Sequence, residues 1–154
     1  MKLIIGKHTV LIDKSDFARI SRLSWWIQKN RNTHYVQCGT TGLRGMLMHR
    51  LLLDARLTDQ VDHRNGNGLD NRRKNLRLAT RSQNCCNARR RKDATLPYRG
   101  IKLDKRDGKY HARISINGKR KHLGTFSDPI SAALAFDRAA KVRGEFAQLN
   151  FPEV

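Results

Sequence analysis

The stretch from residue 61 to residue 84 constrains this chain more than any other part of its sequence. An apolar residue leads into Asp62 and His63, and two Asn-Gly dipeptides follow in close succession. Such dipeptides supply the positive φ angles that tight loops need. The alternating Leu-Arg-Leu segment at 76–78 indicates a short strand, and a Thr and a Ser beyond it can cap a helix that carries Asn84. The stretch therefore predicts a strand, a loop, a second strand and a helix.

These elements carry residue types suited to cutting a phosphodiester bond. That reaction needs an activated water and charge neutralisation at the phosphate. A hard divalent cation neutralises charge, and Asp62 and Asn84 offer it a carboxylate and an amide oxygen. His63 is a candidate general base, because a neutral imidazole titrates near physiological pH. Asn75 can hydrogen-bond across the loop and fix the segment that carries His63.

The spacing is ordered, with twelve positions from His63 to Asn75 and nine from Asn75 to Asn84. With it, the stretch resembles the HNH endonucleases of the ββα-metal fold, in the form whose last ligand is Asn. Homing endonucleases of phages and group I introns carry this form. The resemblance implies that Asp62 and Asn84 bind the metal, Mg²⁺ with Mn²⁺ as a substitute. It also implies that His63 is the general base and that Asn75 braces the loop; Asn87, one helical turn beyond Asn84, is the alternative ligand.

The net charge of the chain also agrees with a partner that contains phosphodiester groups. The chain carries 32 Lys and Arg against 13 Asp and Glu, a net charge of +19, which indicates a polyanion and by default nucleic acid. Both halves share the excess, with +13 in residues 1–95 and +6 in residues 96–154. No long apolar run or signal peptide is visible, so we expect no membrane partner and a cytoplasmic protein of a bacterium or a phage-infected cell. Three cysteines without a Cys-x-x-Cys pair argue against a structural zinc site.

The residues before the motif predict a small β-rich region. The pattern predicts two strands within residues 3–12, further strands at 34–36 and 43–47, and a short helix at 48–53. Trp25 or Trp26 is expected to anchor the core, with base stacking as the alternative role. His49 is interpreted as a support for the 61–84 hairpin rather than as a metal ligand.

A second domain is predicted after the motif. Beyond Asn84 the helix leads into a basic run that favours a DNA-facing helix end and includes Arg89, Arg90 and Arg91. A polar stretch ending in Pro97 then separates two patterns, which predicts an HNH nuclease domain at 1–95 and a DNA-binding domain at 96–154.

The second domain has a clear strand pattern. Three antiparallel strands are predicted between residues 98 and 126, with tight turns near Asp107-Gly108 and Asn117-Gly118. Alternation gives the sheet one apolar face and one polar face, and the polar face carries Lys102, His111, Arg113, Ser115, Arg120 and His122. A helix capped by Asp128 follows, and its small, alanine-rich face is expected to pack closely on the apolar side.

Four segments make this half similar to the Apetala/ethylene-response-factor (AP2/ERF) DNA-binding domain of plants: Y-R-G at 98–100, L-G-T-F at 123–126, A-A-x-A-x-D-x-A-A at 132–140 and L-N-F-P at 149–152. The resemblance implies that the sheet lies in the major groove. The positions matching the family's DNA contacts are Arg99, Lys102, Arg113, Ser115, Arg120 and His122. Arg113, Ser115 and His122 stand where the family has Glu, Arg and Trp, so the family's target sequence does not transfer.

Together these observations predict an α+β chain: a small β-rich region with a ββα-metal motif at about 61–92, then a three-stranded antiparallel sheet packed on one helix. The predicted function is metal-dependent hydrolysis of double-stranded DNA by an HNH homing endonuclease, acting as a monomer, through nicking or double-strand cutting. A DNA-binding regulator with an inactive HNH domain is the leading alternative. An RNA-binding or ribosome-associated protein fits the charge alone.

Overall fold

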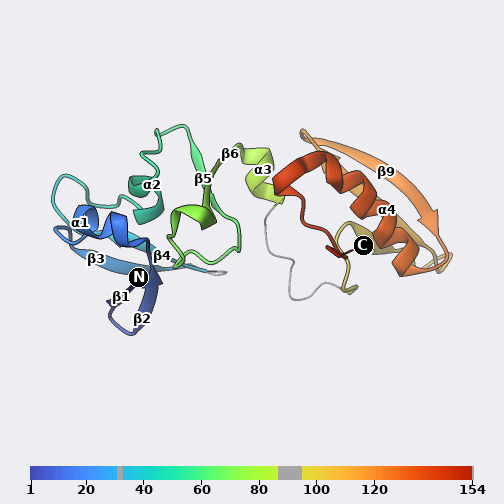
Figure 1. Cartoon of the computed structure of the whole chain (residues 1–154). Coiled ribbons are helices and arrows are strands. Elements are labelled where there is room, and N and C mark those ends of the chain that lie inside the picture. Colours follow the sequence, from blue (N-terminus) through green and yellow to red (C-terminus); the bar gives the residue numbers. More distant parts are fainter. Residues whose placement is uncertain (31–32, 87–94, 154) are drawn as a thin grey trace. The chain divides into compact units, whose positions relative to one another are not determined.

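The computed structural model describes residues 1–30, 33–86 and 95–153 (Figure 1). By its internal contacts the chain divides into two compact units, Met1–Asn84 and Cys85–Val154. The predicted α+β class is confirmed, because short helices alternate with small antiparallel sheets in the first unit and one helix packs on a three-stranded sheet in the second. Among the described residues, no helix is both long and apolar enough to cross a membrane.

The described part of the first unit consists of three antiparallel hairpins joined by short helical segments. The strand pairs are β1 (Lys2–Ile5) with β2 (His8–Leu11), β3 (Trp25–Lys29) with β4 (His34–Cys38), and β5 (Gln60–His63) with β6 (Leu76–Ala79). The helical segments are η1 (Lys14–Asp16), α1 (Phe17–Ile20), α2 (Met48–Leu52), η2 (Arg73–Asn75) and α3 (Arg81–Cys86).

A small apolar core holds these pieces together, formed by Val10, Ile12, Ile20, Val36, Met48, Leu52 and Leu76. Trp25 packs against this core and donates its indole N–H to the Ile20 carbonyl at 2.9 Å, whereas Trp26 is 47% exposed. Trp25 is therefore the anchor. The strand predicted at 43–47 is wrong: this segment forms turns, because Gly42 and Gly45 adopt positive φ, and it contributes only an isolated bridge to β4.

The loop between β5 and β6 is tied to distant parts of the first unit. Asn71 donates its backbone N–H to the Leu11 carbonyl at 2.7 Å, and Leu11 donates to the Leu69 carbonyl at 2.8 Å. Gly68 lies directly against β4, where a Cβ atom would come within 2.6 Å of the Tyr35 ring. The loop is thus held by strands far from it in sequence, which positions the residues that it carries.

The second unit places one helix along one face of its sheet (Figure 1). The strands β7 (Ile101–Leu103), β8 (Tyr110–Ile116) and β9 (Lys119–Phe126) are antiparallel in that order, and α4 (Pro129–Ala140) and η3 (Lys141–Phe146) follow. Asn117 and Gly118 both have positive φ, as a two-residue hairpin turn requires, so this turn is confirmed. The connection at 104–109 is longer than the tight turn predicted near Asp107-Gly108, although Gly108 does adopt positive φ.

Close packing between the sheet and α4 forms the second core. Ile114, Phe136 and Ala140 are buried at its centre. A Cβ atom on Gly100 would lie 2.1 Å from the Phe136 ring, so only glycine fits there, and its φ of 74° also favours glycine. Asp128 caps α4 by accepting the Ser131 backbone N–H at 2.8 Å, as predicted.

Candidate active site and nucleic-acid interface

The β5–β6 hairpin sets Asp62 directly opposite Arg77, and His63 directly opposite Leu76. Asp62 is 5% exposed and accepts a hydrogen bond from Arg77 Nε at 2.8 Å, and Arg77 Nη2 forms an ion pair with the same Oδ2 atom at 2.7 Å. The carboxylate predicted to bind metal is therefore buried and paired with a cation from the neighbouring strand.

Helix α3 brings Asn84 to the same side of the hairpin as Asp62. The helix begins with a reciprocal cap, in which Gln83 donates its backbone N–H to Thr80 Oγ1 at 3.2 Å and Thr80 donates its own to Gln83 Oε1 at 2.7 Å. Asn84 then donates its Nδ2 to Gln60 Oε1 at 3.1 Å. Residues two apart on a strand share a face, so Gln60 and Asp62 point the same way. With its nitrogen engaged, Asn84 has its oxygen left for a cation.

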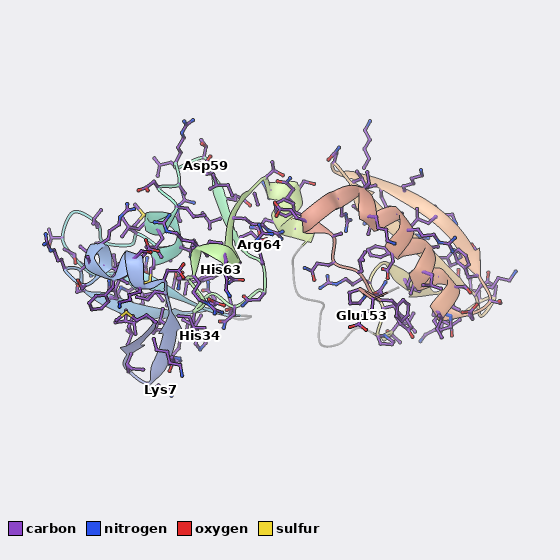
Figure 2. All side chains as sticks on the ribbon, in the orientation of Figure 1. Lys7, His34, Asp59, His63, Arg64 and Glu153 are labelled. Carbon is purple, nitrogen blue, oxygen red and sulfur yellow. The ribbon has the colours of Figure 1, made fainter. Side chains whose placement is uncertain are left out.

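His63 occupies the opposite side of β5, at the end of the strand, where Figure 2 labels it. It packs between β4 and α2: its ring lies 5.9 Å from that of Tyr35 and 4.8 Å from that of His49, the latter nearly perpendicular to it. Burial lowers the pKa of His63, although the Asn71 side chain and the charge of Asp62 act in the other direction. His63 is therefore neutral at physiological pH, the state that a general base needs.

The uncharged ring of His49 packs against His63. Burial, reinforced by the nearby His63 and Arg50, lowers the pKa of His49 to about 3. Its Nδ1 atom is buried and has no hydrogen-bond partner in the part of the chain that the structure describes. The ring stays neutral, so it adds no like charge when His63 takes up a proton. Its role as a support for the hairpin stays a prediction.

Asn75 makes bonds that brace the loop. Its Nδ2 donates to the Asp70 carbonyl at 2.7 Å and to Asn65 Oδ1 at 3.0 Å, and its Oδ1 accepts the Asn65 backbone N–H at 3.1 Å. Asp70 is 2% exposed and binds Arg72 at 2.7 Å, and hydrogen bonds from Arg72 hold the pKa of Asp70 below its usual range. A neutral hydrogen-bond network and one ion pair thus fix the loop that follows His63.

Sequence reasoning missed three residues of this site. Arg77 was detectable, because pairing the two predicted strands places it opposite Asp62. Asn71 is fully buried beside His63, and Tyr35 contacts both His63 and His49. Neither carried a local signal, since each reaches the site only through tertiary packing.

The outer face of the β7–β9 sheet is exposed and basic, as the alternation predicts. Ala112 and Ile114 are buried on the inner face, and the exposed residues of the outer face include Lys102, Arg113, Ser115, Arg120 and His122. A bulge in β9 shifts the pairing from Ala112–Gly124 to Arg113–His122, which keeps His122 on the outer face. Arg99 precedes β7 rather than lying on the sheet, and its backbone N–H donates to Asn150 Oδ1 at 2.6 Å. Arg89, Arg90, Arg91 and the alternative ligand Asn87 lie outside the described residues.

One cluster of potential ligands was not predicted. Within the described residues, Asp104, Asp107 and His111 are the only group of three or more His, Cys, Asp or Glu side chains whose ligand atoms could hold an ion, all within 4.8 Å of one another. Asp104 already pairs with Arg106 at 2.8 Å, and this guanidinium holds the pKa of the Asp104 carboxyl well below its usual range. The cluster belongs to the second unit and involves neither Asp62 nor Asn84.

Comparisons with known proteins give different relatives for the two parts of the chain. A family model described as HNH endonuclease matches residues 59–85, which cover the β5–β6 hairpin and most of α3. The C-terminal region is similar to plant proteins: Dehydration-responsive element-binding protein 2C of Arabidopsis thaliana is 48% identical over 60 residues, 37% of this chain and 17% of the relative. Dehydration-responsive element-binding protein 2E of Arabidopsis thaliana is 58% identical over 40 residues, 25% of this chain and 16% of the relative. APETALA2-like protein 2 of Oryza sativa subsp. indica is 44% identical over 55 residues, 35% of this chain and 13% of the relative.

The chain thus spans less than a fifth of the length of these curated relatives. No solved structure matches it. The resemblance of the first part to HNH endonucleases and of the second to AP2/ERF-type proteins is confirmed.

Proposed function

We propose that the chain is a metal-dependent DNA endonuclease of the HNH homing type, which hydrolyses phosphodiester bonds in duplex DNA. In this proposal residues 1–95 cut and residues 96–154 bind the target. The observation that carries the proposal is the coincidence of the HNH match at 59–85 with the hairpin and helix that hold Asp62, His63, Asn75 and Asn84.

The donor set suits a hard cation. Asp62 and Asn84 offer one carboxylate and one amide oxygen on one side of the hairpin, the ligand types that Mg²⁺ takes while keeping several waters. We expect Mg²⁺, with Mn²⁺ as a substitute; bound there, the ion would neutralise charge on the phosphate. The same side of β5 carries Gln60, which holds the Asn84 amide in position.

The chain's own residues provide the proton transfer. His63 is neutral and accepts a proton from the attacking water at a ring nitrogen. Tyr35 and His49 hold its ring from β4 and α2, and Asn75 fixes the loop that begins after it. The proposed base and the proposed cation ligand are consecutive residues of β5, and the charge of Asp62 reaches His63, where it acts against the lowering of the His63 pKa by burial.

The second unit is proposed to bind DNA through its outer sheet face. Lys102, Arg113 and Arg120 are exposed there, and such side chains reach both phosphates and base edges. Two of the relatives are named dehydration-responsive element-binding proteins, which supports a DNA-binding role for this region. A target sequence does not follow, because Arg113, Ser115 and His122 differ from the family pattern.

Incubation with supercoiled plasmid and Mg²⁺ tests the proposal in one gel. We expect nicked or linear DNA, and none when a chelator replaces the metal. Tight duplex binding without cutting, in Mg²⁺ and in Mn²⁺, would instead identify a DNA-binding regulator with an inactive HNH domain. Preference for RNA over duplex DNA would remove both assignments.

A further inference from the structure

The buried ion pair between Asp62 and Arg77 has no part in the function proposed so far. The Asp62 side chain is 6% exposed and that of Arg77 is 5% exposed, and the two residues are direct partners in the β5–β6 register. Two nitrogens of the guanidinium contact Oδ2 of the carboxylate, at 2.7 and 2.8 Å. The pair is therefore built into the hairpin rather than formed by long side chains meeting at the surface.

Arg77 holds the proposed cation ligand Asp62 with a full positive charge. Neutral donors hold two other polar groups of this site, since Gln60 bonds to Asn84 and Asn75 bonds to Asn65, whereas Asp70, which is not a proposed ligand, pairs with Arg72. A neutral donor could hold the Asp62 carboxylate equally well without repelling a divalent ion. Arg77 places its charge on the same carboxylate that the ion would use, so ion and guanidinium oppose each other there.

Separating Arg77 from Asp62 costs free energy, and a new anion near the guanidinium would offset that cost. A buried charge that loses its partner is strongly unfavourable, and Arg77 is as buried as Asp62. The substrate brings such an anion, because a phosphate that comes close to an ion on Asp62 also comes close to the guanidinium. Guanidinium groups bind phosphate through paired N–H donors.

We propose that Arg77 makes cation binding at Asp62 conditional on DNA. Without DNA, the Arg77 guanidinium neutralises Asp62, so that a divalent cation binds there only weakly. When DNA binds, one of its phosphates pairs with Arg77 instead, and the cation and the DNA then bind together. This inference rests on the proposed nuclease function of the same site. Because coupling between two ligands is reciprocal, DNA strengthens cation binding by the same factor as the cation strengthens DNA binding. Free ions would then engage the site weakly until DNA is present.

The test measures Mn²⁺ affinity by electron paramagnetic resonance on the full chain, with and without a saturating duplex. His63→Ala is the parent, so that the duplex stays intact. Arg77→Met removes the charge and keeps much of the length, and Arg77→Lys keeps the charge. An Asp62→Asn version of the parent removes the ligand charge and gives the background from other sites, including the Asp104–Asp107–His111 group and the DNA itself. Tryptophan fluorescence confirms folding, because both tryptophans lie in the first unit.

In the parent, we expect the duplex to tighten Mn²⁺ binding at least about fivefold, the lower end of typical coupling. Arg77→Met should bind Mn²⁺ more tightly than the parent without DNA, and the duplex should change its affinity less than about twofold, short of that coupling range. Arg77→Lys should keep the dependence on DNA.

Three results would overturn the inference. The first is Mn²⁺ binding by Arg77→Met that is equal to or weaker than that of the parent without DNA, which would make Arg77 an orienting partner of Asp62. The second is an unchanged Mn²⁺ affinity of the parent on adding duplex, a result that stands even if Arg77→Met fails to fold. The third is Mn²⁺ binding no better than the Asp62→Asn background, which would also refute the proposed metal site. DNA-dependent Mn²⁺ binding by a wild-type chain that never cuts plasmid would support the inference and refute only the nuclease activity.

Discussion

The two units place their candidate functional side chains in opposite environments. In the first unit, Asp62, His63 and Asn75 are each about 5% exposed, and hydrogen bonds or ring contacts hold them. In the second unit, the polar side chains of the sheet are exposed and the apolar ones face α4. Chemistry needs fixed geometry and a neutral base, which burial provides, whereas binding a polyanion needs accessible charge. The same residue types therefore predict different mutational behaviour in the two units.

The largest effect should come from the proposed cation ligands of the first unit, Asp62 and Asn84. We expect Asp62→Asn and Asn84→Ala to remove metal-dependent cleavage, with Asp62→Asn weakening metal binding more because it removes the charge. The Asn substitution is preferable to Asp62→Ala, because it keeps a side-chain oxygen that can accept from buried Arg77. Calorimetry with Mn²⁺ in the presence of DNA measures the binding. Normal cutting by Asn84→Ala together with an inactive Asn87→Ala would assign the ligand role to Asn87.

Removal of the base should have the next largest effect. His63→Ala is expected to slow cleavage by about a hundredfold to ten-thousandfold, the usual contribution of a general base, and to leave DNA binding nearly unchanged. His8→Ala, a half-buried histidine on β2 of the same unit, is the matched control and should cut normally. Cleavage by His63→Ala at the wild-type rate would refute the assignment.

Substitutions in the second unit should reduce the affinity for DNA rather than the rate of the chemical step. We expect residues from about Asp93 to Val154, made alone, to fold and bind duplex DNA, with a log–log salt slope of roughly −0.9 for each phosphate contact. Arg113→Ala should weaken binding and, if Arg113 reads a base, lose about 1–3 kcal/mol of sequence preference. Lys141→Ala changes an exposed lysine beyond α4, outside the sheet, and should have little effect. Fluorescence anisotropy over a salt series measures this, and a folded fragment that binds no DNA at low salt would make the sheet a protein-docking surface.

The smallest effect concerns stability of the first unit in acid. His49 has a folded-state pKa of about 3, whereas an unfolded histidine titrates near 6.5, so between these values only the unfolded state takes up a proton there. The stabilisation is complete above pH 6.5 and is lost as pH falls, by up to about 1.4 kcal/mol per pH unit. His49→Gln should reduce this slope. Urea unfolding followed by tryptophan fluorescence reports on the first unit, and an unchanged slope would show that His49 is not neutral when folded.

The sequence predicted the second unit better than the first, for a physical reason. Turn chemistry at Asn117-Gly118, strand alternation and the Asp128 cap are local signals, and all of them agree with the structure. In the first unit, the hairpin and α3 were also marked locally, by the loop residues and by the capping segment before Asn84. The wrong strand prediction at 43–47 shows a limit of local sequence patterns. Glycines with positive φ interrupt a segment whose residues look apolar and alternating.

Residues that support the site escaped prediction because they arrive from other elements. Asn71 and Tyr35 are placed beside His63 by the ties of the loop to β2 and β4, which no local pattern encodes. Arg77 follows from strand pairing alone, but its burial with Asp62 does not. The positions of these polar residues could thus be predicted from the sequence, whereas their degree of burial is known only from the tertiary structure.

The central claim is that cutting and binding belong to separate sites of one chain, and single-turnover cleavage of a plasmid in Mg²⁺ over a range of protein concentrations tests it most directly. We predict that Arg113→Ala cuts slowly at low concentration but reaches the wild-type rate at saturation. His63→Ala should stay at least about a hundredfold slower at every concentration. A wild-type maximal rate for His63→Ala, or a reduced rate for Arg113→Ala that saturation does not restore, would contradict the account.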